Sequence, residues 1–223
     1  MTSVRTDSDS DSGTVDAAQT FVDWARSNSR ALSIAASVIV VAGAGYWFYL
    51  RSKQITENNA QKALMTAKQS MQAGNIPLAQ SDIQKVFLRY ESTTAGVEAA
   101  MLLAQMDFDS GKPQDGISIL EKVAGSGSAS SMQPTILSLE GDGYGQMGKS
   151  DDAAKKYESA AAATRFELEK AFQLAKAARA YQAAGNVAKA REIWSKLATD
   201  PSAVSMASEA HVRLGELTAQ PAK

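Results

Sequence analysis

Small and apolar residues recur along most of the chain with a period of 37 residues. The period is marked by four glycines, Gly74, Gly111, Gly148 and Gly185, and similar small or apolar residues stand at fixed distances on either side of each. A self-similar period of this length is typical of stacked structural repeats. Such repeats hold partners more often than they catalyse reactions. The pattern therefore predicts a helical repeat protein with a binding role.

Each period predicts two antiparallel helices that are joined at the glycine. In the last complete unit, residues 169–186 form one helical pattern that ends at Gly185, and residues 187–201 form a second that closes at Pro201. Glycine suits the left-handed conformation that follows a helix, and proline rarely continues one. Residues 202–219 then predict a terminal helix that covers the exposed end of the stack, as solenoids require.

These offsets resemble the tetratricopeptide repeat, whose signature places a small residue, a glycine turn, an alanine, an aromatic residue and a closing proline along two helices. The fourth unit carries this signature in Ala178, Gly185, Ala190, Trp194 and Pro201. The family's unit has about 34 residues, so the extra residues are expected in the turns, for example in residues 125–131. The resemblance implies an all-α fold: a solenoid of about four helix hairpins plus a capping helix.

A second pattern precedes the repeats, because residues 31–50 contain no charged side chain. As a helix, this stretch spans about 30 Å, which matches the hydrocarbon core of a bilayer. Its last third gathers aromatic residues at 46–49, and Arg51 and Lys53 follow. We therefore predict one transmembrane helix. The alternatives are a buried core helix and a cleaved signal peptide, but the residues before the stretch are net negative, whereas a signal peptide needs a positive region there.

The remaining segments follow from charge and periodicity. Residues 1–30 hold three arginines against five aspartates. Residues 1–13 predict a flexible acidic tail, and residues 14–30 an amphipathic helix along the membrane surface. The repeat domain is expected over residues 51–219, with a short tail at 220–223. Two basic residues flank the apolar stretch on each side, so the positive-inside rule does not decide its orientation.

One string of residues imitates a phosphate-binding loop. Residues 143–150 read GYGQMGKS and satisfy the G-x-x-x-x-G-K-[ST] pattern. Gly148, however, is the turn glycine of the third period, and no alternation of strands and helices surrounds it. Nucleotide binding is therefore not expected. The glycines at 141, 143 and 145 are expected to weaken their helix, each by about 1 kcal/mol relative to alanine.

Composition leaves little other chemistry. The chain has no cysteine, and His211 is its single histidine. This excludes disulfides and thiolate sites and gives no support to a metal site. Basic residues form no stripe with interleaved aromatic residues, so nucleic-acid binding is not expected either. We predict no catalytic residue, no cofactor and no enzymatic activity.

The order of the segments resembles a bacterial family, the ancillary subunit of the Sec translocon. The resemblance rests on VDAAQTFVDWARSNSRALSIAASVIVVAGAGYWFYLRSKQ and on the Gly-Asn turns with an alanine four residues after the asparagine. It implies a bacterial inner-membrane protein with a cytoplasmic N-terminus and a periplasmic repeat domain, whose partners are the translocation channel and periplasmic chaperones. The alternative is a structural accessory subunit that stabilises a large energy-transducing, photosynthetic or secretion assembly.

The expected mechanism is non-covalent. The first helices of the repeats would line a concave surface that holds an extended or helical segment of a protein partner, while the anchor confines that partner to the membrane and raises its effective concentration. Repeat offsets predict the side chains that face this surface: Met71, Met101, Gln105, Phe108, Asp142, Phe172 and Arg179.

Overall fold

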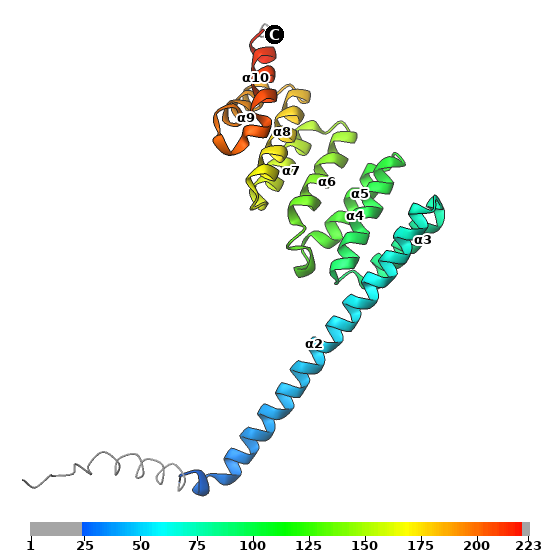
Figure 1. Cartoon of the computed structure of the whole chain (residues 1–223), viewed down its shortest axis with the longest axis vertical. Coiled ribbons are helices and arrows are strands. Elements are labelled where there is room, and N and C mark those ends of the chain that lie inside the picture. The colour runs from blue at the N-terminus through cyan, green and yellow to red at the C-terminus, as the bar shows by residue number, and fades with distance from the viewer. Residues whose placement is uncertain (1–23, 220–223) are drawn as a thin grey trace, which may run out of the picture. The chain divides into compact units, whose positions relative to one another are not determined.

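The computed structural model of the protein describes residues 24–219, and all regular elements in this range are helical (Figure 1). The chain divides into two units, Met1–Ile55 and Thr56–Lys223. The α-helices are α2 Ser29–Gln72, α3 Ile76–Tyr90, α4 Thr94–Asp109, α5 Pro113–Ala124, α6 Gln133–Gln146, α7 Ser150–Ala163, α8 Glu167–Ala183, α9 Val187–Thr199 and α10 Val204–Ala219, with short 3₁₀ helices at Gly127–Ala129 and Pro201–Ala203. The predicted all-α class with stacked helix pairs is confirmed.

The described part of the first unit is the apolar half of α2. This helix is the one element of residues 24–219 that is long and apolar enough to cross a membrane, and none of its most apolar 18-residue window is buried. The core helix of a soluble protein is mostly buried, so that alternative does not fit. The helix continues without interruption past Leu50 to Gln72. The predicted tails at 1–13 and 220–223, and residues 14–23 of the surface helix predicted over 14–30, lie outside the described residues.

The four periodic glycines form the turns within the helix pairs. They connect α2 to α3, α4 to α5, α6 to α7 and α8 to α9, and their φ angles lie between +72° and +78°. No other residue of the described range has a positive φ. A side chain in this conformation is strained, whereas glycine adopts it freely. The 37-residue period therefore marks one left-handed turn per pair, as predicted.

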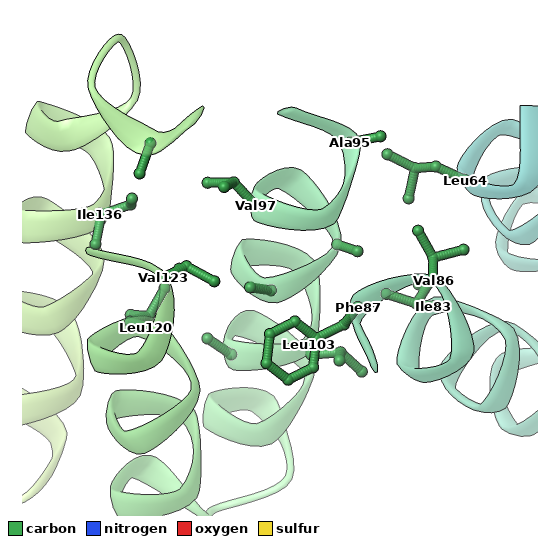
Figure 2. Close-up of a cluster of buried hydrophobic side chains, with 14 of the residues drawn as sticks. Leu64, Ile83, Val86, Phe87, Ala95, Val97, Leu103, Leu120, Val123 and Ile136 are labelled. Atoms are coloured by element: carbon green, nitrogen blue, oxygen red, sulfur yellow. The ribbon is translucent and has the colours of Figure 1, made fainter. Parts of the chain in front are cut away.

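The pairs of the second unit stack through two clusters of buried apolar side chains. Figure 2 shows that Leu64, Ile83 and Val86 pack on one side of α4, while Leu120 and Val123 lie on its other side. Each helix pair thus uses both of its faces to bury apolar surface, which is the main favourable term in folding. The consequence is a linear stack in which a helix pair contacts only its neighbours.

Repeat positions that are buried and apolar in the middle of the stack are exposed at its two ends. The α4 residues Ala95, Ala99 and Leu103 are buried, but one period earlier α2 carries the exposed polar residues Asn58, Lys62 and Thr66. The α8 residues Ala171, Ala175 and Ala178 are buried, but one period later α10 carries the exposed residues Ser208, Val212 and Gly215. Polar outer faces are the usual termination of a solenoid. The outer face of α2 is therefore polar at these positions, whereas that of α10 includes the exposed apolar residue Val212.

A carboxylate from α2 caps the N-terminus of α4. The Thr94 N–H donates to Oε2 of Glu57 over 2.9 Å, and the Ala95 N–H donates to its Oε1 over 3.2 Å. The next amide, Gly96 N–H, donates to the Thr93 side-chain oxygen over 3.0 Å. The first three amides of α4 are thus satisfied by side chains, and the negative charge faces the positive end of the helix dipole.

Replacing Glu57 by alanine is expected to lower the free energy of unfolding by about 1–2 kcal/mol, because two amide donors lose their acceptor together with a favourable charge. Urea unfolding of the full chain in detergent, followed by circular dichroism, measures the change. Glu121 of α5 is an exposed glutamate suited as a control, and Glu121→Ala should change the free energy by less than about 0.5 kcal/mol. Equal effects of the two substitutions would contradict the capping role.

Two glycines of α6 have a packing role that the sequence did not reveal. A Cβ on Gly141 would lie 2.6 Å from the Tyr157 ring, and a Cβ on Gly143 would lie 2.8 Å from the Ile117 side chain. Both glycines are buried. Glycine at these two positions weakens the helix but allows neighbouring side chains to approach closely. The prediction from the sequence included only the weakening of the helix.

Candidate functional site

Ion pairs join the first helices of successive pairs at both ends of the stack. Lys68 of α2 pairs with Glu98 of α4. Three periods later, the Arg179 Nε of α8 donates to Oε1 of Glu209 of α10 over 2.9 Å. Lys68 and Arg179 occupy the same repeat position, and so do Glu98 and Glu209. The same cross-helix contact is therefore made twice, once at each end.

The two central junctions lack this contact. Their equivalent residues are Gln105 and Thr135 between α4 and α6, and Asp142 and Phe172 between α6 and α8. Neither combination can form an ion pair, because each has at most one charged member. At this repeat position the surface along α4, α6 and α8 therefore has no ion pair, and Asp142 of α6 pairs instead with Lys176 of α8, which stands at a different repeat position.

Two hollows occupy this central surface. The first, of about 480 Å³, lies between α4 and α6 and is lined by Gln105, Phe108, Asp109, Leu139, Asp142, Gly145, Gln146 and Tyr157. The second, of about 340 Å³, lies between α6 and α8 and is lined by Gly145, Ser150, Ala153, Tyr157, Lys176, Arg179, Ala180 and Ala183. Because Gly145 and Tyr157 line both, the two hollows adjoin each other, and together they are here called the central groove.

A polar network holds the middle of the central groove. Asp142 Oδ1 accepts a hydrogen bond from the Tyr157 hydroxyl over 2.6 Å and lies 2.7 Å from the Lys176 Nζ. The Lys176 Nζ also donates to the Ser138 hydroxyl over 3.0 Å and lies 4.5 Å from the centre of the Tyr157 ring. Burial, followed by the hydrogen bond to Asp142, raises the pKa of Tyr157, so its hydroxyl remains a donor at neutral pH. The network fixes the wall between the two hollows.

Four of the seven residues predicted to face a partner lie on the central groove. Gln105, Phe108 and Asp142 line the first hollow, and Arg179 lines the second. Phe108 is only 6% exposed and forms part of the floor. Gln105, Asp142 and Arg179 share one repeat position, which explains why the structure brings them to the same face.

The other three predicted residues lie outside both hollows. Met101 is half-buried and packs against the core of the first cluster. Met71 is half-buried near the end of α2, and Phe172 is 46% exposed on α8. A role for these three side chains in binding stays a prediction.

Sequence reasoning missed three groups that shape the central groove. Tyr157 comes from α7, the second helix of its pair, whereas the prediction considered only the first helices. Lys176 lies three residues before Arg179, in a position where α6 has Leu139. Gly145 stands at a repeat position where the other pairs carry Met71, Phe108 and Gln182. Comparing the residues at each repeat position, rather than the motif alone, would have found all three.

The residues that imitate a phosphate loop lie on the end of α6, the turn and the start of α7. The Gly148 N–H donates to the Gly145 carbonyl over 3.0 Å, and the Lys149 N–H donates to the Tyr144 carbonyl over 2.9 Å. A phosphate loop needs such amides free to face the phosphates. Here they close the end of a helix, and the described chain places no strand before them.

The stack of antiparallel helix pairs with left-handed glycine turns defines a helical-repeat protein whose central groove lies along the first helices of the pairs. A family model described as a tetratricopeptide repeat-like domain matches residues 23–137, just over half of the chain. The chain belongs to this family. No curated protein matches significantly.

Among solved structures, the chain is similar to a putative kinesin light chain with nearly identical TPR-like repeats from Podosopora anserina. The TM-score is 0.54 at 18% identity, over 73% of this chain and 91% of that one. A point variant of the same protein gives a TM-score of 0.54 at 17% identity, over the same shares of both chains. At this identity the likeness shows the fold of stacked helix pairs.

Proposed function

We propose that the protein is a membrane-anchored scaffold for protein–protein interaction that assists protein translocation or the recruitment of periplasmic chaperones. It holds a segment of a protein partner in the central groove, by non-covalent contacts. The apolar half of α2 anchors it in the bacterial inner membrane, with the N-terminus in the cytoplasm and the repeats in the periplasm. Repeat domains of this family are typically non-catalytic scaffolds with protein partners.

The observation that carries the proposal is the central groove itself. The ends of the stack are closed by the pairs Lys68–Glu98 and Arg179–Glu209, while the two central junctions offer adjoining hollows along α4, α6 and α8. A concave strip of this kind can take an extended or helical segment whose side chains enter successive hollows. The hydroxyl and the carboxylate in its lining, Tyr157 and Asp142, are engaged with each other and with Lys176, and we infer that the lining binds a partner.

The translocation role is supported by the order of segments in the sequence. An acidic N-terminal segment, one apolar stretch that ends in aromatic residues, and periodic helix pairs follow one another as in the ancillary subunit of the Sec translocon. An anchor beside a channel would keep the groove at high effective concentration near chains that emerge from it.

Site-specific photocrosslinking in native membranes tests the proposal. A photoreactive residue at Gln105, on the central groove, is expected to crosslink to translocation-channel subunits, exported chains or chaperones, identified by mass spectrometry. The same residue at Glu121, which lies on α5 outside both hollows, serves as the matched control and should give none of these products.

Other crosslinking results would point elsewhere. Stoichiometric products with the subunits of one large complex, formed through residues 31–50 and not through the groove, would replace the scaffold by the accessory-subunit alternative. Products formed only with cytoplasmic proteins would overturn the orientation. Identical products from Gln105 and Glu121 would remove the groove as the binding surface.

A further inference from the structure

The hollows of the central groove meet at one repeat position, where the third helix pair has a glycine. Residues Met71, Phe108, Gly145 and Gln182 occupy this position in the four helix pairs, so three pairs carry a large side chain and the third carries none. Gly145 lines both hollows. A Cβ added there would meet only the Ala153 Cβ, at 4.0 Å, which is ordinary contact. A Cβ at position 145 therefore causes no clash, and a methionine there, as in the first pair, is expected to extend into the hollow.

The first hollow has an acidic and aromatic lining. Its charged lining residues are Asp109 and Asp142, and no lysine or arginine lines it. Phe108 and Tyr157 contribute aromatic rings, and Gln105 and Gln146 contribute amides. Asp109 and Gln146 are the last residues of α4 and α6, so the hollow lies at helix ends that carry partial negative charge. All of these features favour a cation.

The two carboxylates differ in their partners. Asp142 is compensated by Lys176 and by the Tyr157 hydroxyl. The side chain of Asp109 is exposed and makes no hydrogen bond or ion pair within residues 24–219. The carboxylate of Asp109 is therefore available to a cationic group of a ligand.

We propose that the hollow opened by Gly145 receives a lysine or arginine side chain of the partner segment. This inference rests on the proposed binding function of the central groove and specifies its chemistry. The aliphatic stem of the basic residue lies along the aromatic floor, and its charged group pairs with Asp109. An acidic or neutral side chain at the same place lacks this pairing.

The test uses the full chain in detergent and fluorescein-labelled peptides of about twelve residues. The peptides share a neutral sequence and differ at one central residue, which is arginine, lysine, glutamine or glutamate. Fluorescence anisotropy should show the arginine and lysine peptides binding at least about tenfold more tightly than the other two. Both Gly145→Met and Asp109→Asn should reduce this preference to less than about twofold, the first by filling the hollow and the second by removing its free charge.

Matched variants and three outcomes make the test decisive. Gly215→Met places the same side chain on α10, where a Cβ meets nothing within 4 Å, and Glu121→Gln removes a charge outside the groove. Both variants should keep the preference for basic peptides, with unchanged helicity.

The wild-type chain could instead bind all four peptides equally, with Gly145→Met abolishing this binding. That result would overturn the inference of a basic residue, but it would support the proposed function. A basic preference that survives Gly145→Met would place the site elsewhere. Binding of none of the peptides would contradict the proposed function as well.

Discussion

Replacing Gly96 by alanine is expected to lower the free energy of unfolding by about 3 kcal/mol, the upper end of the usual cost of overpacking. A Cβ at this position would lie 1.9 Å from the Tyr90 carbonyl oxygen and 2.5 Å from its carbon. Both atoms belong to the backbone, so no side-chain rotation relieves the clash. The same carbonyl accepts hydrogen bonds from the Thr93 amide and hydroxyl, which fixes the turn between α3 and α4.

Thermal and urea unfolding of the full chain in detergent measure this loss. Gly215→Ala is the matched control, because it also replaces a helical glycine but in open space; it should stabilise α10 by about 0.5–1 kcal/mol. A Gly96→Ala variant as stable as the parent would show that the α3–α4 turn can shift, and the proposed rigidity of this turn would then be wrong.

Replacing Lys156 by methionine is expected to cost about 2–3 kcal/mol. Glu140 of α6 is 2% exposed and its carboxylate pairs with the ammonium group of Lys156 on α7. Removing one partner of a buried ion pair leaves an uncompensated charge, and this usually costs more than the pair contributes. The lysine side chain is 32% exposed, so water near Glu140 keeps the loss toward the lower end of the range for buried pairs.

A double variant separates the charge effect from packing. Glu140 stands at the repeat position held by Leu103 in α4 and Ala177 in α8, both buried and apolar. Combining Glu140→Leu with Lys156→Met should therefore recover most of the lost stability, as measured by a double-mutant cycle in urea. Lys155→Met, beside an exposed pair with Asp152, should cost less than about 1 kcal/mol. Additive losses in the cycle would argue against a coupled pair.

The sequence was sufficient to predict the turns and the helix pairs, because these depend on local backbone properties. A left-handed turn needs glycine whatever surrounds it, and Gly148 could be assigned from its spacing although it completes a phosphate-loop string. The stretch over residues 31–50 is similarly local, since its length and lack of charge are visible without the fold. The glycine turns occur four times in the sequence, and the apolar stretch persists over twenty residues, so each is visible from the sequence.

The features that could not be predicted are those that depart from the period. Gly96, Gly145 and Glu140 each replace a different residue type at their repeat position, and only the three-dimensional neighbours explain why. A side chain at Gly96 would clash with the Tyr90 carbonyl, the Glu140 carboxylate pairs with Lys156, and the missing side chain of Gly145 leaves a hollow. Repeat offsets predict which face of a helix a residue occupies, but they do not predict how deeply it is buried. Met101 and Phe108 were both predicted to face a partner, and both pack in the first buried cluster.

The capping of α4 by Glu57 sets a lower limit on the size of any soluble fragment of this protein. Ala60, Leu64 and Ala67 of α2 belong to the first buried cluster, and Glu57 satisfies two amides of α4. A fragment cut at the first glycine turn would lose these contacts and expose the apolar surface they cover. Recombinant production of the repeats without the apolar stretch should therefore begin no later than Thr56, the first residue of the second unit, and retain at least the last seventeen residues of α2.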